Sequence, residues 1–298
     1  MEPVQRHFDP VEKTVDPHGH FIKTLANPLK NFAPFFCCKN TVIFQGDCLE
    51  ILRSFPEDAI DMVFADPPYM LSNDGFTCQN GKMVGVNKGK WDKSGGFEHD
   101  MLFHNEWISA CRRVLKPEGT IWISGTYHSI YQCGYLLQKN NFHILNDIAW
   151  FKPNAAPNLS CRFFTASHET ILWARKDKEA KHTFNYREMK SGHFPEDKLK
   201  NENTQMRSVW SIPAPGNREK EQGKHPTQKP LELLKRIVLA STNEDDIVLD
   251  PFCGSGTTGA ACGYFGNRSF AGIEIDKNYC DLALKRLSRA NARYIHPA

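Results

Sequence analysis

Two short segments of the sequence gather residue types that could handle an amine and a nucleoside. The first, Asp66-Pro67-Pro68-Tyr69, follows a predicted buried strand over 61–65, and ligands bind at such strand ends in open α/β sheets. The Asp66 carboxylate and a proline-flanked carbonyl, which cannot join a sheet ladder, can together accept both hydrogens of an amino group. The Tyr69 ring could stack on the attached base. A proline pair can also simply end a strand, so the tetrapeptide alone fixes no function.

The second segment, DPFCGSGTTG over 250–259, lies between a predicted strand and a predicted helix. Gly254 and Gly256 fit the GxGxxG pattern and would let the backbone approach a ligand closely, while Glu274 ends the next strand and could accept hydrogen bonds from two ribose hydroxyls. These residues predict a cofactor that contains adenosine, although an isolated pattern of this kind is about as often a glycine-rich turn without a ligand. A Walker A phosphate loop is excluded because no Lys follows the glycines.

Together the two motifs suit methyl transfer to an aryl amine. The lone pair of such an amine is delocalised into its ring, and two acceptors that hold its hydrogens restore its nucleophilicity. A sulfonium donor has a good neutral leaving group, so alignment and electrostatics suffice without a metal. An amine paired in a duplex must leave the stack, and an aromatic platform helps to offset that cost, since stacking is worth about 1–3 kcal/mol per base.

Composition narrows the class of protein further. A chain of 298 residues with 40% hydrophobic content can bury one large core, and its net charge of +3 favours polyanions only weakly. The ten cysteines are scattered, which indicates reduced thiols, and no paired CxxC motif indicates a metal site. No apolar run is long enough to cross a bilayer and the first twenty residues lack a signal-peptide pattern, so we expect a cytoplasmic protein without membrane contact.

Strand and helix patterns alternate after a proline-rich N-terminal arm over 1–40. The predicted strands are 41–45, 61–65, 120–124, 144–151, 169–174, 247–249 and 270–275. The predicted helices are 48–52, 107–115, 231–241, 256–263 and 279–291. This alternation predicts an α/β fold with a mostly parallel, doubly wound sheet, as a single domain over 41–298. Two polar and basic stretches interrupt it, over 71–96 and 176–224, and loops of this length are usually functional or disordered.

With DPPY at 66–69 and FCGSG at 252–256, the sequence resembles the DNA amino-methyltransferases that act on adenine N6 or cytosine N4. Because the catalytic motif precedes the cofactor motif, it resembles the circularly permuted beta group, whose remaining cofactor motif looks like HPTQKP at 225–230. The stretches ADPPYMLSNDG, KWDK, APNLSCRFF and HETILWARK are most similar to the small adenine methyltransferases of DpnII-type and HinfI-type systems. The resemblance extends over 41–290 and implies a Rossmann-like, S-adenosylmethionine-dependent methyltransferase fold with inserted DNA-recognition loops.

The resemblance also implies roles for individual residues. In the catalytic motif, Asp66 and Pro67 would hold the amine, and Tyr69 would stack on the base. The implied cofactor-binding residues are Asp47, Asp250, Phe252, Gly254, Gly256, Glu274, Thr227 and Lys229. Among them, Glu274 would bind the ribose, and Thr227 and Lys229 would face the methionine end of the donor. Asp47 would lie near the adenosine moiety, or would instead cap the helix that follows it.

Basic residues of the two long interruptions are candidates for DNA contact. Four lysines directly after the base-binding motif could reach phosphates beside a flipped nucleotide: Lys82, Lys88, Lys90 and Lys93. The segment 176–224 occupies the position of the target-recognition region in the permuted group. Its candidates for reading guanine edges are Arg187, Arg207 and Arg218. A basic run is more often a solvated loop, so these contacts depend on proximity to Tyr69.

The predicted activity is site-specific methylation of adenine N6 in DNA. Cytosine N4 is the alternative, since the preference for adenine depends on Asp66, where cytosine enzymes more often carry Ser. A NAD-dependent oxidoreductase that uses the glycine loop is the alternative from a different class, and it leaves the DPPY segment unexplained. The sites GATC and GANTC follow from the resemblance alone, as do a homodimer and either a cognate restriction endonuclease or an orphan enzyme.

Overall fold

The structure is a computed structural model that describes residues 25, 32–38, 40–70, 76–79, 82–85, 92–191, 194, 197, 201 and 204–295. One sheet has the strand order β1-β2-β11-β10-β3-β6-β8-β7-β9. Its strands are β1 (Phe36–Cys38), β2 (Thr41–Gln45), β3 (Ile60–Ala65), β6 (Leu115–Gly125), β7 (His143–Phe151), β8 (His168–Arg175), β9 (Val209–Ser211), β10 (Ile247–Asp250) and β11 (Ser269–Glu274). A separate antiparallel hairpin joins β4 (Phe76–Gln79) and β5 (Lys82–Gly85).

The middle of the sheet is parallel and its far side is mixed. Strands β2, β11, β10, β3 and β6 run parallel to one another in that order, whereas β8 is antiparallel to both β6 and β7. The short strand β9 adds a parallel edge to β7. The prediction of a mostly parallel sheet is therefore confirmed, with an antiparallel addition that strand patterns alone do not reveal.

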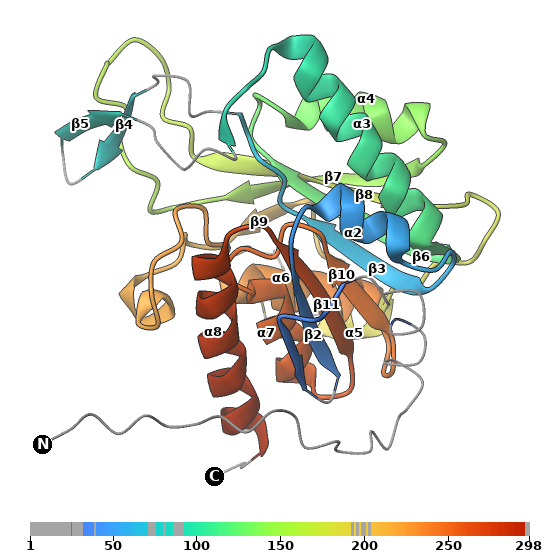
Figure 1. Ribbon diagram of the computed structural model, residues 1–298. Helices are drawn as coiled ribbons and strands as arrows, with labels where there is room; N and C mark the ends of the chain where they lie inside the picture. The colour runs from blue at the N-terminus through green and yellow to red at the C-terminus, as the bar shows by residue number, and fades with distance from the viewer. Residues whose placement is uncertain are drawn as a thin grey trace, which may run out of the picture.

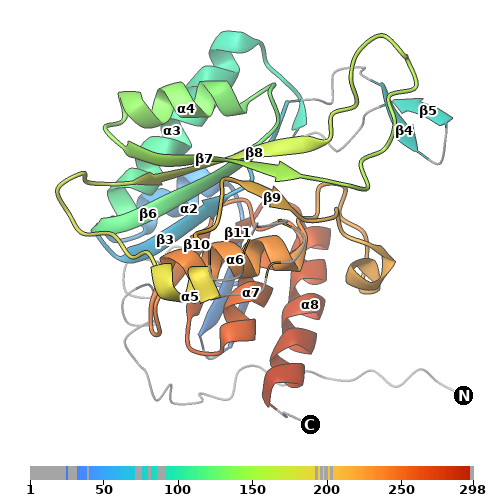
Figure 2. The ribbon, with the colours of Figure 1, turned by 180° about the vertical axis from the view of Figure 1, so that it is seen from behind.

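Helices cover both faces of the sheet, as Figures 1 and 2 show. One face carries α2 (Cys48–Ser54), α3 (Phe97–Val114) and α4 (Ile130–Lys139), and the other carries α5 (Tyr186–Ser191), α6 (Leu231–Ser241), α7 (Thr257–Phe265) and α8 (Lys277–Ile295). Each face has its own apolar core: Trp107 and Phe44 belong to the first, and Trp122 and Phe270 to the second. The doubly wound prediction is confirmed, because two separate cores require apolar side chains on both sides of the strands.

Several elements differ from their predicted extents. Helix α3 begins at Phe97 instead of 107, because its first turns bury the polar residues Asp100 and His104 and so lack an apolar repeat. Helix α4 has no counterpart among the predictions. Residues 116–119, which separate the predicted helix over 107–115 from the predicted strand over 120–124, lie inside β6, where the register with β3 passes from Ile60–Leu115 to Met62–Thr120. The long polar stretch 176–224 contains α5, β9 and the 3-10 helix η3 (Asn217–Lys220).

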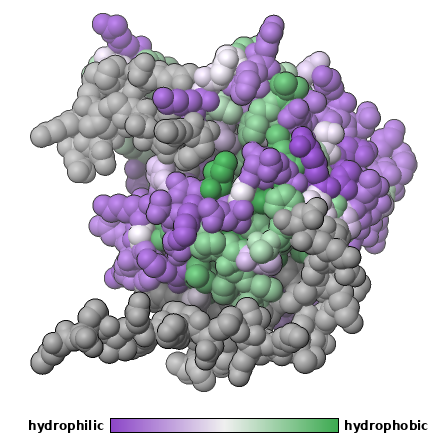
Figure 3. Space-filling view, in the orientation of Figure 1, coloured by the Kyte–Doolittle hydropathy of each residue, from purple (hydrophilic) through white to green (hydrophobic). Residues whose placement is uncertain are grey.

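The connections from β3 and β10 diverge at the centre of the sheet. From β3 the chain crosses by α3 to β6, and from the neighbouring strand β10 it crosses by α7 on the other face to β11. Such a reversal opens a crevice at the carboxyl ends of the two strands. In the space-filling view, apolar residues form a band through the middle of one face with hydrophilic residues on its flanks (Figure 3).

The segment predicted as an N-terminal arm is described only in part. Residues 1–24 and 26–31 lie outside the described residues, while β1 pairs antiparallel with β2. Within the described part of the chain, no helix is long and apolar enough to span a membrane.

Candidate active site

A cavity of about 260 Å³ opens at the carboxyl ends of β2, β3, β10 and β11. It brings together most of the residues that the sequence predicts for the base and the cofactor. Those that line it are Asp47, Asp66, Pro68, Thr227, Lys229, Asp250, Phe252, Gly254 and Glu274. Pro67, Tyr69 and Gly256 do not line it; they lie next in sequence to residues that do.

The glycine loop owes its shape to two left-handed residues. Gly254 has φ +51°, and a Cβ placed there would lie 3.2 Å from the His225 ring. Gly256 has φ +73° and precedes the first turn of α7, where a Cβ would lie 3.0 Å from that of Ala283. A side chain at either position would be strained, so the sequence needs glycine here to close the loop against its neighbours.

Two carboxyl groups in the wall of the cavity are held by backbone and hydroxyl groups. The oxygens of Glu274 accept hydrogen bonds from the backbone N–H groups of Gly254 and Asp276, each at 2.8 Å, and burial raises the Glu274 pKa. Asp250 accepts hydrogen bonds from the Phe252 backbone and the Thr258 hydroxyl, and burial raises its pKa to about 7. Both carboxylates are thereby fixed at the crevice.

Asp47 caps the helix that follows it, which was the alternative to a place near the adenosine, and it also lines the cavity. Its Oδ1 accepts hydrogen bonds from Leu49 N at 2.8 Å and Glu50 N at 3.2 Å, which makes it the N-cap of α2. A capping carboxylate satisfies backbone donors that the first helical turn leaves without partners. Asp47 lines the cavity, and its carboxylate has acceptor capacity left beside these two hydrogen bonds.

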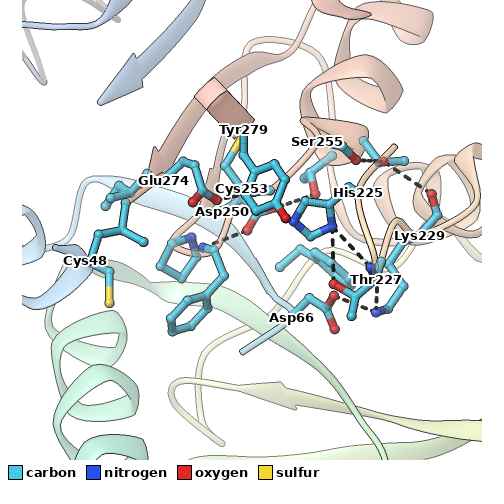
Figure 4. A pocket seen from close by; sticks show the side chains of 18 of the residues that line it. Cys48, Asp66, His225, Thr227, Lys229, Asp250, Cys253, Ser255, Glu274 and Tyr279 are labelled. Carbon is cyan, nitrogen blue, oxygen red and sulfur yellow. Dashed lines mark hydrogen bonds and ion pairs between the residues drawn. The ribbon is translucent and has the colours of Figure 1, made fainter. Parts of the chain in front are cut away.

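Aromatic residues form other parts of the wall. The Phe252 ring meets Trp107 at a centroid distance of 5.4 Å and an interplanar angle of 87°. On another side, the ring centroids of His225 and Tyr279 lie 4.2 Å apart. Figure 4 shows the two rings next to each other. Neither His225 nor Tyr279 was predicted; the HPTQKP motif contains His225, but nothing in the spacing of Tyr279 marks it as a wall residue.

The base-binding tetrapeptide forms a compact ionic cluster with Lys229. The Lys229 ammonium lies 2.5 Å from Asp66 Oδ2, and Figure 4 shows these two side chains pointing toward each other. The Tyr69 hydroxyl lies 3.0 Å from the same ammonium and 2.6 Å from Asp66 Oδ1. Tyr69 is only 4% exposed. The structure thus directs Lys229 to Asp66, whereas the resemblance predicted that it faces the methionine end of the donor.

Two further charged residues, neither of them predicted, complete this cluster. Glu169 Oε2 lies 3.0 Å from the Tyr69 hydroxyl and 3.6 Å from Lys229 Nζ, and Glu169 Oε1 pairs with Lys152 Nζ at 2.9 Å. Burial alone would raise the Glu169 pKa, but Lys229 and Lys152 outweigh it and lower the pKa to about 2. For Asp66, burial and the Glu169 charge raise the pKa while Lys229 opposes them. The sequence signal for Glu169 is weak, because a charged residue near the start of a strand usually marks only where the strand begins.

The predicted DNA contacts are not all brought to the crevice. Lys93 is exposed just before α3. Arg187 is exposed on α5, which lies against the C-terminal end of α6, whereas the N-terminal end of α6 is beside the cavity. Arg207 is exposed and lines a second cavity, whose walls include residues of β7, β8 and α5. Arg218 is exposed on η3. Lys88 and Lys90 lie outside the described residues, as does the side chain of Lys82.

Among the described residues, no group of three or more His, Cys, Asp or Glu side chains could hold a metal ion. The doubly wound sheet, its glycine loop and the Asp66 turn in one crevice define a Rossmann-like methyltransferase. Residues 60–285 match the family described as DNA methylase, and the chain belongs to this family.

Known relatives agree with this assignment. The type II methyltransferase M2.MboI of Moraxella bovis is 51% identical over 248 residues, covering 83% of this chain and 88% of the relative. The type II methyltransferase M2.DpnII of Streptococcus pneumoniae is 48% identical over 259 residues, covering 87% and 93%. The crystal structure of an M1.HpyAVI-SAM complex is 33% identical with a TM-score of 0.60, covering 83% and 98%. The cytosine-N4-specific PvuII DNA methyltransferase, 19% identical with a TM-score of 0.64 and covering 88% and 95%, shares the fold.

Proposed function

We propose that this chain transfers a methyl group from S-adenosylmethionine to N6 of adenine within a short DNA sequence. The observation that carries the proposal is the shared cavity, in which the Asp66 turn at the end of β3 faces the Gly254–Glu274 pair at the ends of β10 and β11. An amine held at Asp66 would lie beside a methyl group held over the glycine loop.

The charges of the cavity fit this donor better than a dinucleotide. Four carboxyl groups line it, those of Asp47, Asp66, Asp250 and Glu274, against the ammonium of Lys229, which is paired with Asp66. S-adenosylmethionine carries a positive sulfonium and a positive ammonium beside one carboxylate, so acidic walls attract it. A nicotinamide dinucleotide would bring a negative pyrophosphate against the same carboxylates, which disfavours the oxidoreductase alternative.

S-adenosylmethionine, when bound, supplies an electrophilic methyl group on a sulfonium with a neutral thioether as leaving group. The residues of the chain position it. Glu274 is fixed by two backbone N–H groups and has lone pairs left for ribose hydroxyls. Phe252, held edge-on by Trp107, offers an apolar surface suited to the adenine ring.

Asp66 and the carbonyl between the two prolines are the groups that would hold the target amine. The ladder of β3 ends at Ala65, so the carbonyl of Pro67 is outside the sheet and free of ladder pairing. Burial raises the pKa of Asp66, which also suits it to take up the proton that the nitrogen loses after methylation. Stacking of the base on the Tyr69 ring stays a prediction.

Adenine is proposed over cytosine because Asp66 heads the tetrapeptide. The DNA substrate and the type II designation of the relatives support a place in the cytoplasm beside a cognate restriction endonuclease, and a homodimer remains part of the proposal. The lysines over 82–93 are proposed to contact phosphates, and GATC and GANTC are the sites to test first.

The test is incubation of the protein with unmodified DNA containing GATC and GANTC and with labelled S-adenosylmethionine. We expect label in N6-methyldeoxyadenosine after digestion to nucleosides and mass spectrometry. Asp66→Ala should abolish it, while the matched control Asp281→Ala, an exposed carboxylate paired with Lys277, should leave it unchanged. Label in N4-methyldeoxycytidine would show that the target is cytosine N4 and not adenine N6. No label in DNA, or equal labelling by Asp66→Ala, would overturn the proposal.

Titration separates the cofactor from the substrate. S-adenosylhomocysteine should bind to both the wild type and Asp66→Ala, and NAD should bind to neither.

A further inference from the structure

Glu169 and Asp66 compete for the same hydroxyl hydrogen. The Tyr69 oxygen lies 2.6 Å from Asp66 Oδ1 and 3.0 Å from Glu169 Oε2, and a phenol has a single hydrogen to donate. Both distances are within hydrogen-bonding range, so rotation about the C–O bond moves the hydrogen from one carboxylate to the other. No side chain has to move for this exchange.

In the structure, both oxygens of Asp66 already have protein partners. Tyr69 occupies Oδ1 and the Lys229 ammonium occupies Oδ2. Each oxygen keeps a second lone pair, but a hydrogen bond already accepted makes it a weaker acceptor for the target amine. A second acceptor in reach of the Tyr69 hydroxyl would strengthen Asp66 Oδ1 as an acceptor.

Glu169 has the properties of that second acceptor. Its carboxylate is fixed from the other side by Lys152 at 2.9 Å, and its side chain is 11% exposed. Lys229 Nζ, at 3.6 Å, also faces it, so the ammonium can follow the hydroxyl. The strand geometry supports this position, because β8 pairs Glu169 with Trp150 of β7 and Thr170 with Gly125 of β6 at the same edge as Asp66.

We propose that Glu169 is a positioning residue that accepts the Tyr69 hydroxyl hydrogen when Asp66 accepts the target amine. The inference depends on the proposed function, since it assumes an amine at Asp66. Hydrogen bonds are exchanged without any proton transfer. The Tyr69 O–H rotates from Asp66 to Glu169, and an N–H of the base then donates to Asp66 in its place. The low pKa of Glu169 keeps it ionised and able to accept throughout the neutral range.

A double-mutant cycle with Tyr69→Phe tests this role. Phenylalanine removes the competing hydrogen, so Asp66 is then free of Tyr69 whether or not Glu169 is present. Glu169→Gln should lower kcat at least 10-fold when Tyr69 is present and less than 2-fold in the Tyr69→Phe background. The KM for S-adenosylmethionine should stay unchanged in both, because Glu169 does not line the cofactor cavity.

Equal fold-changes of kcat in the two backgrounds would overturn the inference, because a structural role acts regardless of the hydroxyl. Glu169→Asp, which keeps the charge but withdraws the carboxylate by one methylene, should reproduce the same background dependence and serves if Glu169→Gln fails to fold. Thermal unfolding and S-adenosylhomocysteine binding report folding of each variant. Glu232→Gln, an exposed carboxylate paired with Lys235, is the matched control and should change neither parameter.

The proposed function and this inference can fail separately. If the wild type labels no DNA, or Asp66→Ala labels it normally, the proposed function is wrong. If the wild type methylates and Asp66→Ala does not, but the cycle is additive, only the role of Glu169 is wrong.

Discussion

Replacing Lys229 by methionine would remove an ammonium that lies between two buried carboxylates. Lys229 Nζ is 2.5 Å from Asp66 and 3.6 Å from Glu169, and the side chains are 6%, 12% and 11% exposed in that order. Methionine keeps the length of the aliphatic stem, so the change is mainly one of charge. Among the described residues, the substitution leaves Glu169 paired with Lys152 and takes from Asp66 the cation that pairs with it.

The expected loss follows from the burial of the pair. Removing one partner of a buried ion pair costs about 3–5 kcal/mol, and we expect a loss of this size at pH 8. A carboxyl group whose folded-state pKa is raised destabilises the fold as the pH rises through that pKa. Burial already raises the Asp66 pKa, and loss of the ammonium raises it further. A larger share of Asp66 is then protonated at pH 5 than at pH 8, so the loss of stability should be smaller at pH 5.

Urea denaturation followed by tryptophan fluorescence measures the free energy of unfolding of wild type and Lys229→Met at pH 5 and at pH 8. The control is Lys277→Met, which breaks an exposed pair of 3.0 Å with Asp281 and should cost no more than about 1 kcal/mol at either pH. The reasoning would be refuted by a Lys229→Met loss that is equal at the two pH values, or no larger than that of the control.

Three other substitutions have expected outcomes. Gly254→Ala should lower the affinity for S-adenosylhomocysteine at least 10-fold by calorimetry, because its φ of +51° and the His225 ring at 3.2 Å leave no room for a Cβ; unchanged affinity would contradict this. Asp250→Asn should flatten the fall in stability toward pH 7, since burial raises the Asp250 pKa to about 7 and the amide does not titrate; parallel denaturation profiles would argue against it. Phe164→Ala should weaken DNA binding about 5-fold or more in fluorescence anisotropy, since Phe164 is 98% exposed on the loop over 152–167; equal binding would exclude stacking on bases.

The central strands could be predicted because they are short, apolar and bounded by polar residues. The predicted strand over 41–45 coincides with β2, and the helix over 231–241 with α6. Helix α4 was missed although Ile130, Cys133, Leu136 and Leu137 have helical spacing, because Gly134 and the polar residues between them weaken the pattern. Whether the strands after β6 run parallel or antiparallel depends on how their connections cross, which spacing does not encode.

The site was predictable in its location and less so in its contacts. The Asp66 turn and the glycine loop share a cavity because strand ends of a parallel sheet meet at one edge, and that follows from the motifs. The direction of Lys229 does not follow, because an ammonium is attracted equally by a ligand carboxylate and by Asp66. Glu169 is about a hundred residues from Tyr69 in sequence, so only the tertiary structure brings them together.

Strand β11 joins the two ends of the chain. It lies between β10 and β2, so the N-terminal strands β1 and β2 reach the rest of the sheet only through a segment near residue 270, and Asn40 bonds the backbone of Gly266 across 226 positions. During synthesis on a ribosome, the Asp66 turn would therefore emerge long before the donor site could close around it. A nascent chain that stops short of β11 holds the amine site without a methyl-donor site, and the two can form one site only after β11 has been synthesised.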